Sequence, residues 1–265
     1  MEKKGEHGNI EQRLTSDIIS DATLYALTLH IHDSGVDVRI SSRLNDRTVV
    51  DKRLDFGPRA ASLQAFEEMV YDNSLLTADF HKVEIIVDTN RFFVMSADDC
   101  TDDEVERRIN LLWPYDRLGI ELLPVVNEIE RGKTCLVWAI DRPLKGFLQR
   151  TWNNPAISHR LAVATRYFAL NSPHGGTGTV HLHITGDRLD VAAFNRDGLV
   201  LLNSYVTHSP ADGAYYALAA LQHIEFDNDT DRVMVDGDTN QRNGLIESLR
   251  PYVKTVIPET GAVRR

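Results

Sequence analysis

The chain has 265 residues, of which 29 are Lys or Arg and 39 are Asp or Glu, so its formal net charge is −10. Its 42% hydrophobic and 26% charged residues are typical of a folded globular protein and exclude extensive disorder. The length suits one large domain or two smaller ones. The acidic balance argues against a protein that binds a nucleic-acid backbone, so we expect no nucleic-acid partner.

The chain lacks the segments that mark membrane or secreted proteins. Apolar runs such as Tyr215–Leu221 are much shorter than the ~20 residues that cross a bilayer, so we expect no membrane partner. Residues Met1–Arg13 are polar and do not resemble a secretory signal. Two cysteines, Cys100 and Cys135, are too few for a disulfide framework. These features predict a cytoplasmic protein with reduced thiols.

An internal repeat begins at the first expected strand. Leu29–Val38 reads LHIHDSGVDV and Leu182–Val191 reads LHITGDRLDV, at a constant offset of 182 − 29 = 153 residues. Alternating apolar and polar residues follow both segments, with turns at Asn45-Asp46 and Asn195–Gly198. This pattern predicts an antiparallel three-stranded meander in each half.

A helix and a buried strand follow each meander. Apolar residues spaced three and four apart predict helices at Ala61–Tyr71 and Ala211–Ile224. Short apolar runs that end in Asp, Val83–Asp88 and Arg232–Asp236, predict strands that are buried on both faces.

A second helix and strand complete each half. In the second half we expect a helix at Asn243–Tyr252 and a strand at Lys254–Ile257. In the first half we expect a helix at Asp102–Leu112, whose acidic first turn suits the helix dipole, then a strand at Cys135–Ile140 and a helix at Leu144–Trp152. Each half therefore reads β-β-β-α-β-α-β.

This order of elements predicts an α/β fold with mixed sheets, in which two ribonuclease H-like units form an actin-like ATPase architecture. We expect a polar N-terminal extension over residues 1–20, a first half over 21–150 and a second half over 151–265. The competing interpretation is a chance likeness between two unrelated α/β halves.

The middle of the chain resembles a known bacterial family. The resemblance rests on Arg91–Met95 with the acidic helix after it, on Val125–Asn127, on Ala139–Leu148 and on Ile157–Arg160. These segments are similar to domain-of-unknown-function family 3822, whose members have an actin-like ATPase fold. The likeness extends from about residue 21 to about residue 258. It implies the fold and carries no assigned reaction.

The actin-like resemblance implies a nucleotide between the two halves, with MgATP as the ligand. In such proteins an Asp-x-Gly loop after the first strand of each half cradles phosphates and positions hydrated Mg²⁺. Asp33-Ser34-Gly35 matches this loop, although the same residues also form ordinary hairpin turns. The second loop reads Thr185-Gly186-Asp187, with the acid after the glycine, which argues against hydrolysis.

The segment Val233–Leu249 resembles the adenosine-binding part of actin-like proteins, in which glycines let the backbone approach the nucleotide. The alternative is a strand–turn–helix connection that is only structural. If MgATP binds, the resemblance gives each residue a role: metal-bound water at Asp33; phosphates at Ser34, Gly35, Thr185 and Gly186; adenosine at Gly237, Asp238 and Gly244.

Two His-x-His pairs, His30/His32 and His181/His183, each place both imidazoles on one face of a strand. Such a pair is able to bind Zn²⁺. The two pairs are out of register with the repeat and belong to separate expected sheets, so they should not converge on one ion. We therefore predict no metal site.

Two functions remain open. The first is a scaffold or regulatory protein with degenerate phosphate loops, either non-catalytic or weakly nucleotide-binding, that acts through a protein partner. The second is a working ATPase or phosphotransferase that closes over MgATP. Intact fold signals beside an altered second loop favour the scaffold.

Overall fold

The computed structural model describes residues 19, 21–56, 62–172 and 177–259. Nearly all of the expected extension over residues 1–20 lies outside this part, and the expected limit after residue 150 stays a prediction. The chain divides into two compact units. The first contains the residues up to Phe92, Asp102–Val126 and Val137–Arg160; the second contains Phe93–Thr101, Asn127–Leu136 and the residues from Leu161 onward.

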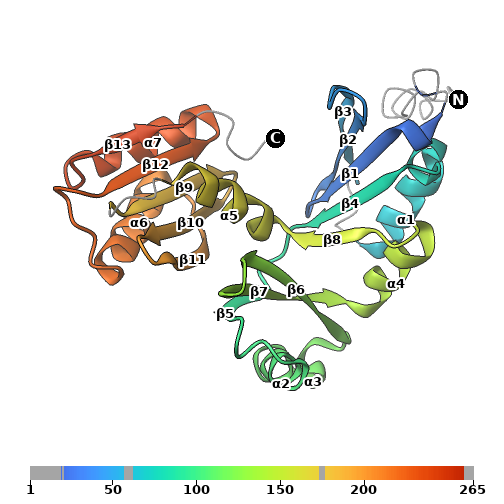
Figure 1. Ribbon diagram of the computed structural model, residues 1–265, viewed down its shortest axis with the longest axis horizontal. Helices are drawn as coiled ribbons and strands as arrows, with labels where there is room; N and C mark the ends of the chain where they lie inside the picture. Colours follow the sequence, from blue (N-terminus) through green and yellow to red (C-terminus); the bar gives the residue numbers. More distant parts are fainter. Residues whose placement is uncertain (1–18, 20, 57–61, 173–176, 260–265) are drawn as a thin grey trace, which may run out of the picture. The chain divides into compact units, whose positions relative to one another are not determined.

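The first unit is built on a five-stranded mixed sheet with the order β3-β2-β1-β4-β8 (Figure 1). The central strand β1 pairs antiparallel with β2 and parallel with β4. Leu27 and Leu29 of β1 are fully buried because they alternate onto one face. The strands are β1 (Tyr25–Ile31), β2 (Gly35–Ser42), β3 (Thr48–Asp55), β4 (Lys82–Val87) and β8 (Ala156–His159).

The second unit repeats this arrangement with a sheet of order β11-β10-β9-β12-β13. Its central strand β9 pairs antiparallel with β10 and parallel with β12. The strands are β9 (Thr179–Thr185), β10 (Arg188–Asn195), β11 (Gly198–Val206), β12 (Arg232–Gly237) and β13 (Val256–Pro258).

The two units agree in register as well as in strand order. Ile31 faces Val36 in the first hairpin, and Ile184 faces Leu189 in the second, which is the same pair displaced by 153 residues (184 − 31). A shift of one residue would turn every side chain to the opposite face, so this agreement is specific. The predicted duplication and its fold class are confirmed.

Two helices accompany the first sheet, α1 (Leu63–Asp72) and α4 (Arg142–Thr151). Ser62 begins α1 by accepting a hydrogen bond from the backbone N–H of Ala65, as an N-cap does. Phe66 of α1 and Phe147 of α4 meet edge to face, with ring centroids 5.5 Å apart. The two predicted helices are thereby joined through an aromatic contact.

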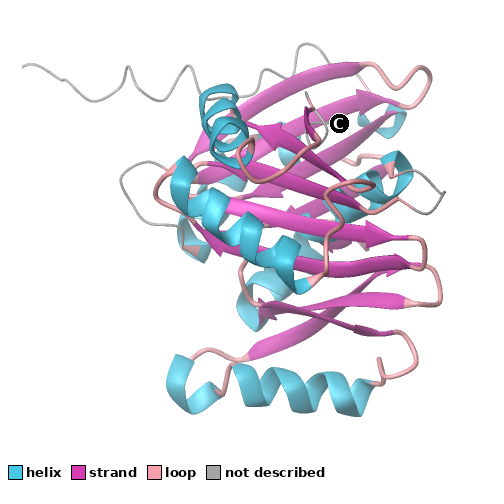
Figure 2. Ribbon diagram, turned by 90° about the vertical axis from the view of Figure 1, so that its left-hand side faces the viewer, coloured by secondary structure: helices cyan, strands magenta, loops and turns pink. Residues whose placement is uncertain are grey.

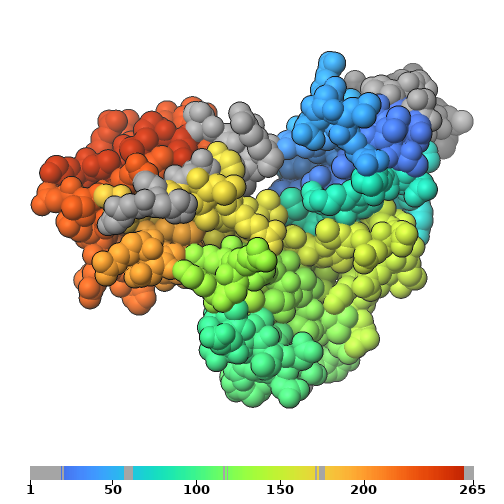
Figure 3. All heavy atoms as spheres, in the orientation of Figure 1, coloured from blue at the N-terminus to red at the C-terminus, as the bar shows by residue number. Residues whose placement is uncertain are grey.

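The second sheet is covered by helices on both faces (Figure 2). Val180, Leu182 and Ile184 of β9 point into a core shared with α6 and α7. Figure 3 shows the described atoms of these elements as spheres, coloured from yellow to red along the chain. The opposite face carries His181, which stacks on Phe168 of α5 with centroids 4.6 Å apart. The helices are α5 (Arg160–Asn171), α6 (Pro210–His223) and α7 (Thr239–Leu249).

One part of the expected order is wrong. The predicted helix Asp102–Leu112 and strand Cys135–Ile140 exist, but they do not complete the first repeat; α4 and β8 do so. They belong to a segment inserted after β4, whose strands form a separate sheet of order β5-β7-β6. This segment comprises β5 (Phe92–Ser96), α2 (Asp102–Leu112), α3 (Tyr115–Leu118), β6 (Leu122–Glu130) and β7 (Thr134–Asp141).

We also observe two short 3-10 helices, Ala22–Leu24 and Ser74–Thr77. Helix α7 begins four residues before the helix predicted at Asn243 (243 − 239), because Asp238 ends the preceding turn in extended conformation.

The backbone conformation at residue 237 and the close approach of a neighbouring strand require glycine there. Its φ is +123°, and a Cβ there would lie 1.8 Å from the carbonyl oxygen of Ile184. Gly186 has a φ of +58° but open space around it. We expect Gly237→Ala to lower the free energy of unfolding by more than about 3 kcal/mol, and Gly186→Ala by about 1 kcal/mol.

Urea denaturation of the two variants beside the unmodified protein measures both losses. Equal losses in the two variants would contradict the conclusion that the close approach to Ile184 makes Gly237 the more sensitive position. Because a side chain at residue 237 disrupts the sheet, a Gly237 variant reports on folding and not on ligand binding.

Candidate functional site

Each unit has a candidate site at the carboxyl end of its central strand. The turn His32–Ser34 joins β1 to β2, and Gly186-Asp187 joins β9 to β10. Strands β4 and β12 run parallel to these central strands and end beside the same turns. In open α/β sheets, ligands bind at the carboxyl ends of strands.

In the first unit, the Asp-x-Gly residues form a hairpin turn. Asp33 and Ser34 are exposed. The Ser34 hydroxyl accepts a hydrogen bond from Nη2 of Arg53 at 2.7 Å. A Cβ on Gly35 would lie 2.3 Å from the carbonyl oxygen of Leu54 on β3, so the pairing of β2 with β3 already explains this glycine.

In the second unit, side chains from the start of α7 cover the corresponding turn. Asp238 Oδ2 accepts hydrogen bonds from the Thr185 hydroxyl at 3.3 Å and from the Gly186 N–H at 3.4 Å. Gln241 donates its side-chain N–H to the Gly186 carbonyl. A carboxylate of the chain therefore lies where the resemblance would place a phosphate.

Contacts within the chain also explain why residues 237 and 244 are glycines. Gly237 lies against the backbone of Ile184, and a Cβ on Gly244 would lie 2.9 Å from Pro210 at the start of α6. The structure thus brings Thr185, Gly186 and Asp238 together. It accounts for Gly237 and Gly244 without a nucleotide.

A charged cluster occupies the carboxyl ends of β1 and β4 in the first unit. His32 Nε2 donates to Asp37 Oδ2 at 2.7 Å, and His32 Nδ1 lies 3.7 Å from Asp88 Oδ2. Arg160, at the start of α5, forms an ion pair through Nε with Asp88 Oδ1, and both side chains are buried or nearly so. The His30 ring is tilted against the His32 ring, with centroids 4.0 Å apart.

The two imidazoles differ in basicity. Burial alone lowers the pKa of His32, but hydrogen bonds and charges from Asp37 and Asp88 outweigh burial and raise its pKa to about 8. Burial, followed by the charge of His32, lowers the pKa of His30 to about 3. The hydrogen bond from His32 holds the pKa of Asp37 below its usual value.

Sequence reasoning missed three members of these arrangements: Asp37, Arg160 and Gln241. Asp37 lies five residues after His32 across a hairpin, so the alternation of β2 was the available signal. Nothing local marked Arg160 or Gln241, because their partners are distant in sequence.

Cys135 does not supply a nucleophile. Burial raises the pKa of Cys135 to about 11, and the neighbouring Cys100 thiol adds to this shift. A thiol with so high a pKa carries almost no thiolate at neutral pH.

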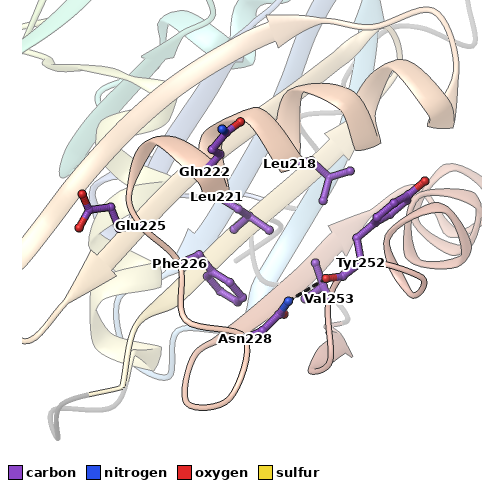
Figure 4. Close-up of a pocket in the computed structure, with 8 residues that line it drawn as sticks. All are labelled: Leu218, Leu221, Gln222, Glu225, Phe226, Asn228, Tyr252 and Val253. Atoms are coloured by element: carbon purple, nitrogen blue, oxygen red, sulfur yellow. Dashed lines mark hydrogen bonds between the residues drawn. The ribbon is translucent and has the colours of Figure 1, made fainter.

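A hollow of about 360 Å³ lies on the second unit (Figure 4). It lies beside the C-terminal part of α6, and Asn228 bridges it by donating to the carbonyl of Tyr252 at 2.9 Å. Apolar side chains such as Leu218 and Phe226 line it. It is near the amino end of β12, opposite to the turn at Gly186, and so is separate from the candidate site.

Comparisons with known proteins agree with this architecture. A family model described as "Protein of unknown function (DUF3822)" matches residues 15–256, which is most of the chain. The chain belongs to the DUF3822 family. The predicted family is thereby confirmed, and no curated protein matches the chain.

A solved structure from Bacteroides thetaiotaomicron VPI-5482, a protein with actin-like ATPase fold and unknown function, is similar to this DUF3822 chain. It has a TM-score of 0.77 and 18% identity, with 90% of this chain and 91% of that chain covered. A PilM-PilN type IV pilus biogenesis complex follows, with a TM-score of 0.49, 11% identity and 92% of each chain covered. The likeness to the Bacteroides thetaiotaomicron protein shows the fold alone.

None of the described helices of this DUF3822 protein is long and apolar enough to cross a membrane.

The cluster predicts a pH dependence of stability. Because the native pKa of His32 lies above its ordinary value of 6.5, the native state binds more protons between pH 6.5 and about 8. Its contribution is complete below pH 6.5 and is lost as the pH rises through about 8. We expect a loss of about 1 kcal/mol, discounted for solvent screening.

Urea denaturation in chelator-treated buffer from about pH 6 to about pH 9 measures this loss, and His32→Gln should abolish it. Comparing the two proteins removes the contribution of other titrating groups. An equal slope in both would contradict the prediction. The groups around His32 are His30 from β1, Asp37 from β2, Asp88 after β4 and Arg160 from α5, with Arg53 from β3 beside Asp37.

Proposed function

We propose that this protein is a scaffold or regulatory member of the actin-like ATPase fold that binds a protein partner and does not hydrolyse ATP. One observation carries the proposal: polar groups of both strand-end turns are already engaged by other groups of the same chain. Arg53 engages Ser34, and Asp238 engages Thr185 and Gly186.

Charge supports this proposal. A phosphate entering the second turn must displace or approach the Asp238 carboxylate, and the like charges repel each other. In the first unit, Asp37 and Asp88 are paired with His32 and Arg160. Hydrated Mg²⁺ would have to compete with these cations for the carboxylates.

The second turn also lacks the geometry of the resemblance. Asp187 follows Gly186, so its backbone lies on the β10 side of the turn, where its carbonyl accepts from Thr207 N–H at 2.7 Å. The residues present therefore do not fit MgATP in the roles that the resemblance gives them.

Thermal unfolding with and without millimolar MgATP tests the proposal. A ligand at about 100 times its Kd would stabilise by about 2.7 kcal/mol and raise Tm by roughly 5–10 °C in a protein of this size. We expect no shift. A shift that needs both ATP and Mg²⁺ would overturn the proposal in favour of a working ATPase or phosphotransferase.

A second experiment, on a variant of the protein, tests the role of Asp238. We expect Asp238→Asn to bind inorganic pyrophosphate more tightly than the unmodified protein, because removing the charge removes the repulsion at Gly186. Isothermal titration measures both affinities, and Asp229→Asn is the matched control, since Asp229 is an exposed acid of the same unit paired with Lys254. Equal affinities in all three proteins would show that Asp238 does not block the turn.

A further inference from the structure

We propose that His30, His32 and Asp88 form a binding site for one divalent transition-metal ion. One ligand atom from each residue lies within 4.8 Å of the other two. Two imidazoles and a carboxylate suit Zn²⁺ and related ions, whereas Mg²⁺ prefers an all-oxygen shell. The site goes beyond the proposed function and does not depend on it.

Topology explains why these residues meet. His30 and His32 alternate onto the same face at the end of β1, and Asp88 follows β4, which runs parallel beside it. Ile31 faces Val87, so His32 and Asp88 are the next residues along both strands. The fold thus brings Asp88 to the histidines across 56 residues (88 − 32).

The histidines have the environment of metal ligands. His30 Nε2 is buried and has no hydrogen-bond partner among the described residues. A buried polar atom without a partner is costly, and an ion is one recognised explanation for it. His32 donates Nε2–H to Asp37 and turns Nδ1 toward Asp88, which is the carboxylate–histidine–metal arrangement of known sites.

The distances permit an ion after small adjustments. A tetrahedral ion about 2.1 Å from each ligand holds its ligands roughly 3.4 Å apart, against 3.7 Å between His32 Nδ1 and Asp88 Oδ2. The ligand atoms lie at most 4.8 Å apart, and this separation reaches the tetrahedral value if each side chain moves by less than about 1 Å. Arg160 binds Asp88 through Oδ1, which keeps Oδ2 on the side of His32.

The charge count is also compatible. With both imidazoles neutral, Asp37, Asp88 and Arg160 leave one negative charge at the cluster. A divalent ion changes this to one positive charge, which a water or hydroxide in the fourth position can offset. Three protein ligands and one open position distinguish such a site from a closed structural one.

Unit two supplies a natural control. His183 is the repeat equivalent of His30 (30 + 153 = 183), but Thr185 stands where His32 does (32 + 153 = 185). No cluster of metal-ligating side chains is found around His183 among the described residues. Loss of His183 should therefore leave metal binding unchanged.

The experiment uses the full chain, freed of metal with a chelator and titrated with Zn²⁺ against a chromophoric competitor. We expect one equivalent to bind, and Co²⁺ to give the visible absorption of a four-coordinate site. Loss of a residue that only hydrogen-bonds to a metal ligand lowers metal affinity roughly 10–100-fold. We expect His30→Gln and His32→Gln each to lower the affinity for Zn²⁺ by more than this. Asp37→Asn removes only the hydrogen-bond partner of His32, so its loss of Zn²⁺ affinity should lie within that range. His183→Gln is the control and should bind Zn²⁺ as tightly as the unmodified protein.

Circular dichroism confirms that each variant is folded before titration. Failure of the folded, unmodified chain to bind Zn²⁺ would overturn the inference. So would binding that His30→Gln and His32→Gln leave unchanged, since the ion would then sit elsewhere. Because MgATP is absent throughout, these outcomes are independent of the proposed function.

Discussion

Each five-stranded sheet depends on a central strand that pairs on both sides while burying apolar residues on one face. β1 and β9 each pair antiparallel with the next strand and parallel with a later one. Because one face of each strand is buried, a slip of one residue would expose its whole apolar set, so the register is strongly specified. Everything at the carboxyl ends of these strands, including both candidate sites, is positioned by that register.

The same position carries different chemistry in the two units. Opposite the end of β4 the first unit has His32, held between Asp37 and Asp88, and Arg160 closes the cluster. Opposite the end of β12 the second unit has Thr185 beside Asp238. The two units share one register because burial of an apolar face constrains it, whereas the residues at the carboxyl ends of the strands differ between the units.

The sequence predicted the repeat, most elements and the fold class, because alternation and helical spacing are local properties of the chain. It did not predict that Asp102–Leu112 and Cys135–Ile140 belong to an insertion. Cys135–Ile140 is a continuous apolar run, which suits a buried strand in any sheet, and nothing in its residues identifies the strand that it pairs with. The sequence predicted the loops of the candidate sites. It did not predict that His32, Asp37, Asp88 and Arg160 lie together.

By itself, the sequence determined where strands and helices form and which of their faces are apolar, because these depend on neighbours within a few residues. Only the tertiary structure decided that Asp88 meets both His32 and Arg160, and that Asp238 reaches the turn at Gly186. It also decided that Gly237 serves the close approach of β12 to β9. Such contacts join residues that are more than 50 positions apart, as in Asp88 and His32 (88 − 32 = 56), and the pairing of parallel strands alone brings them together.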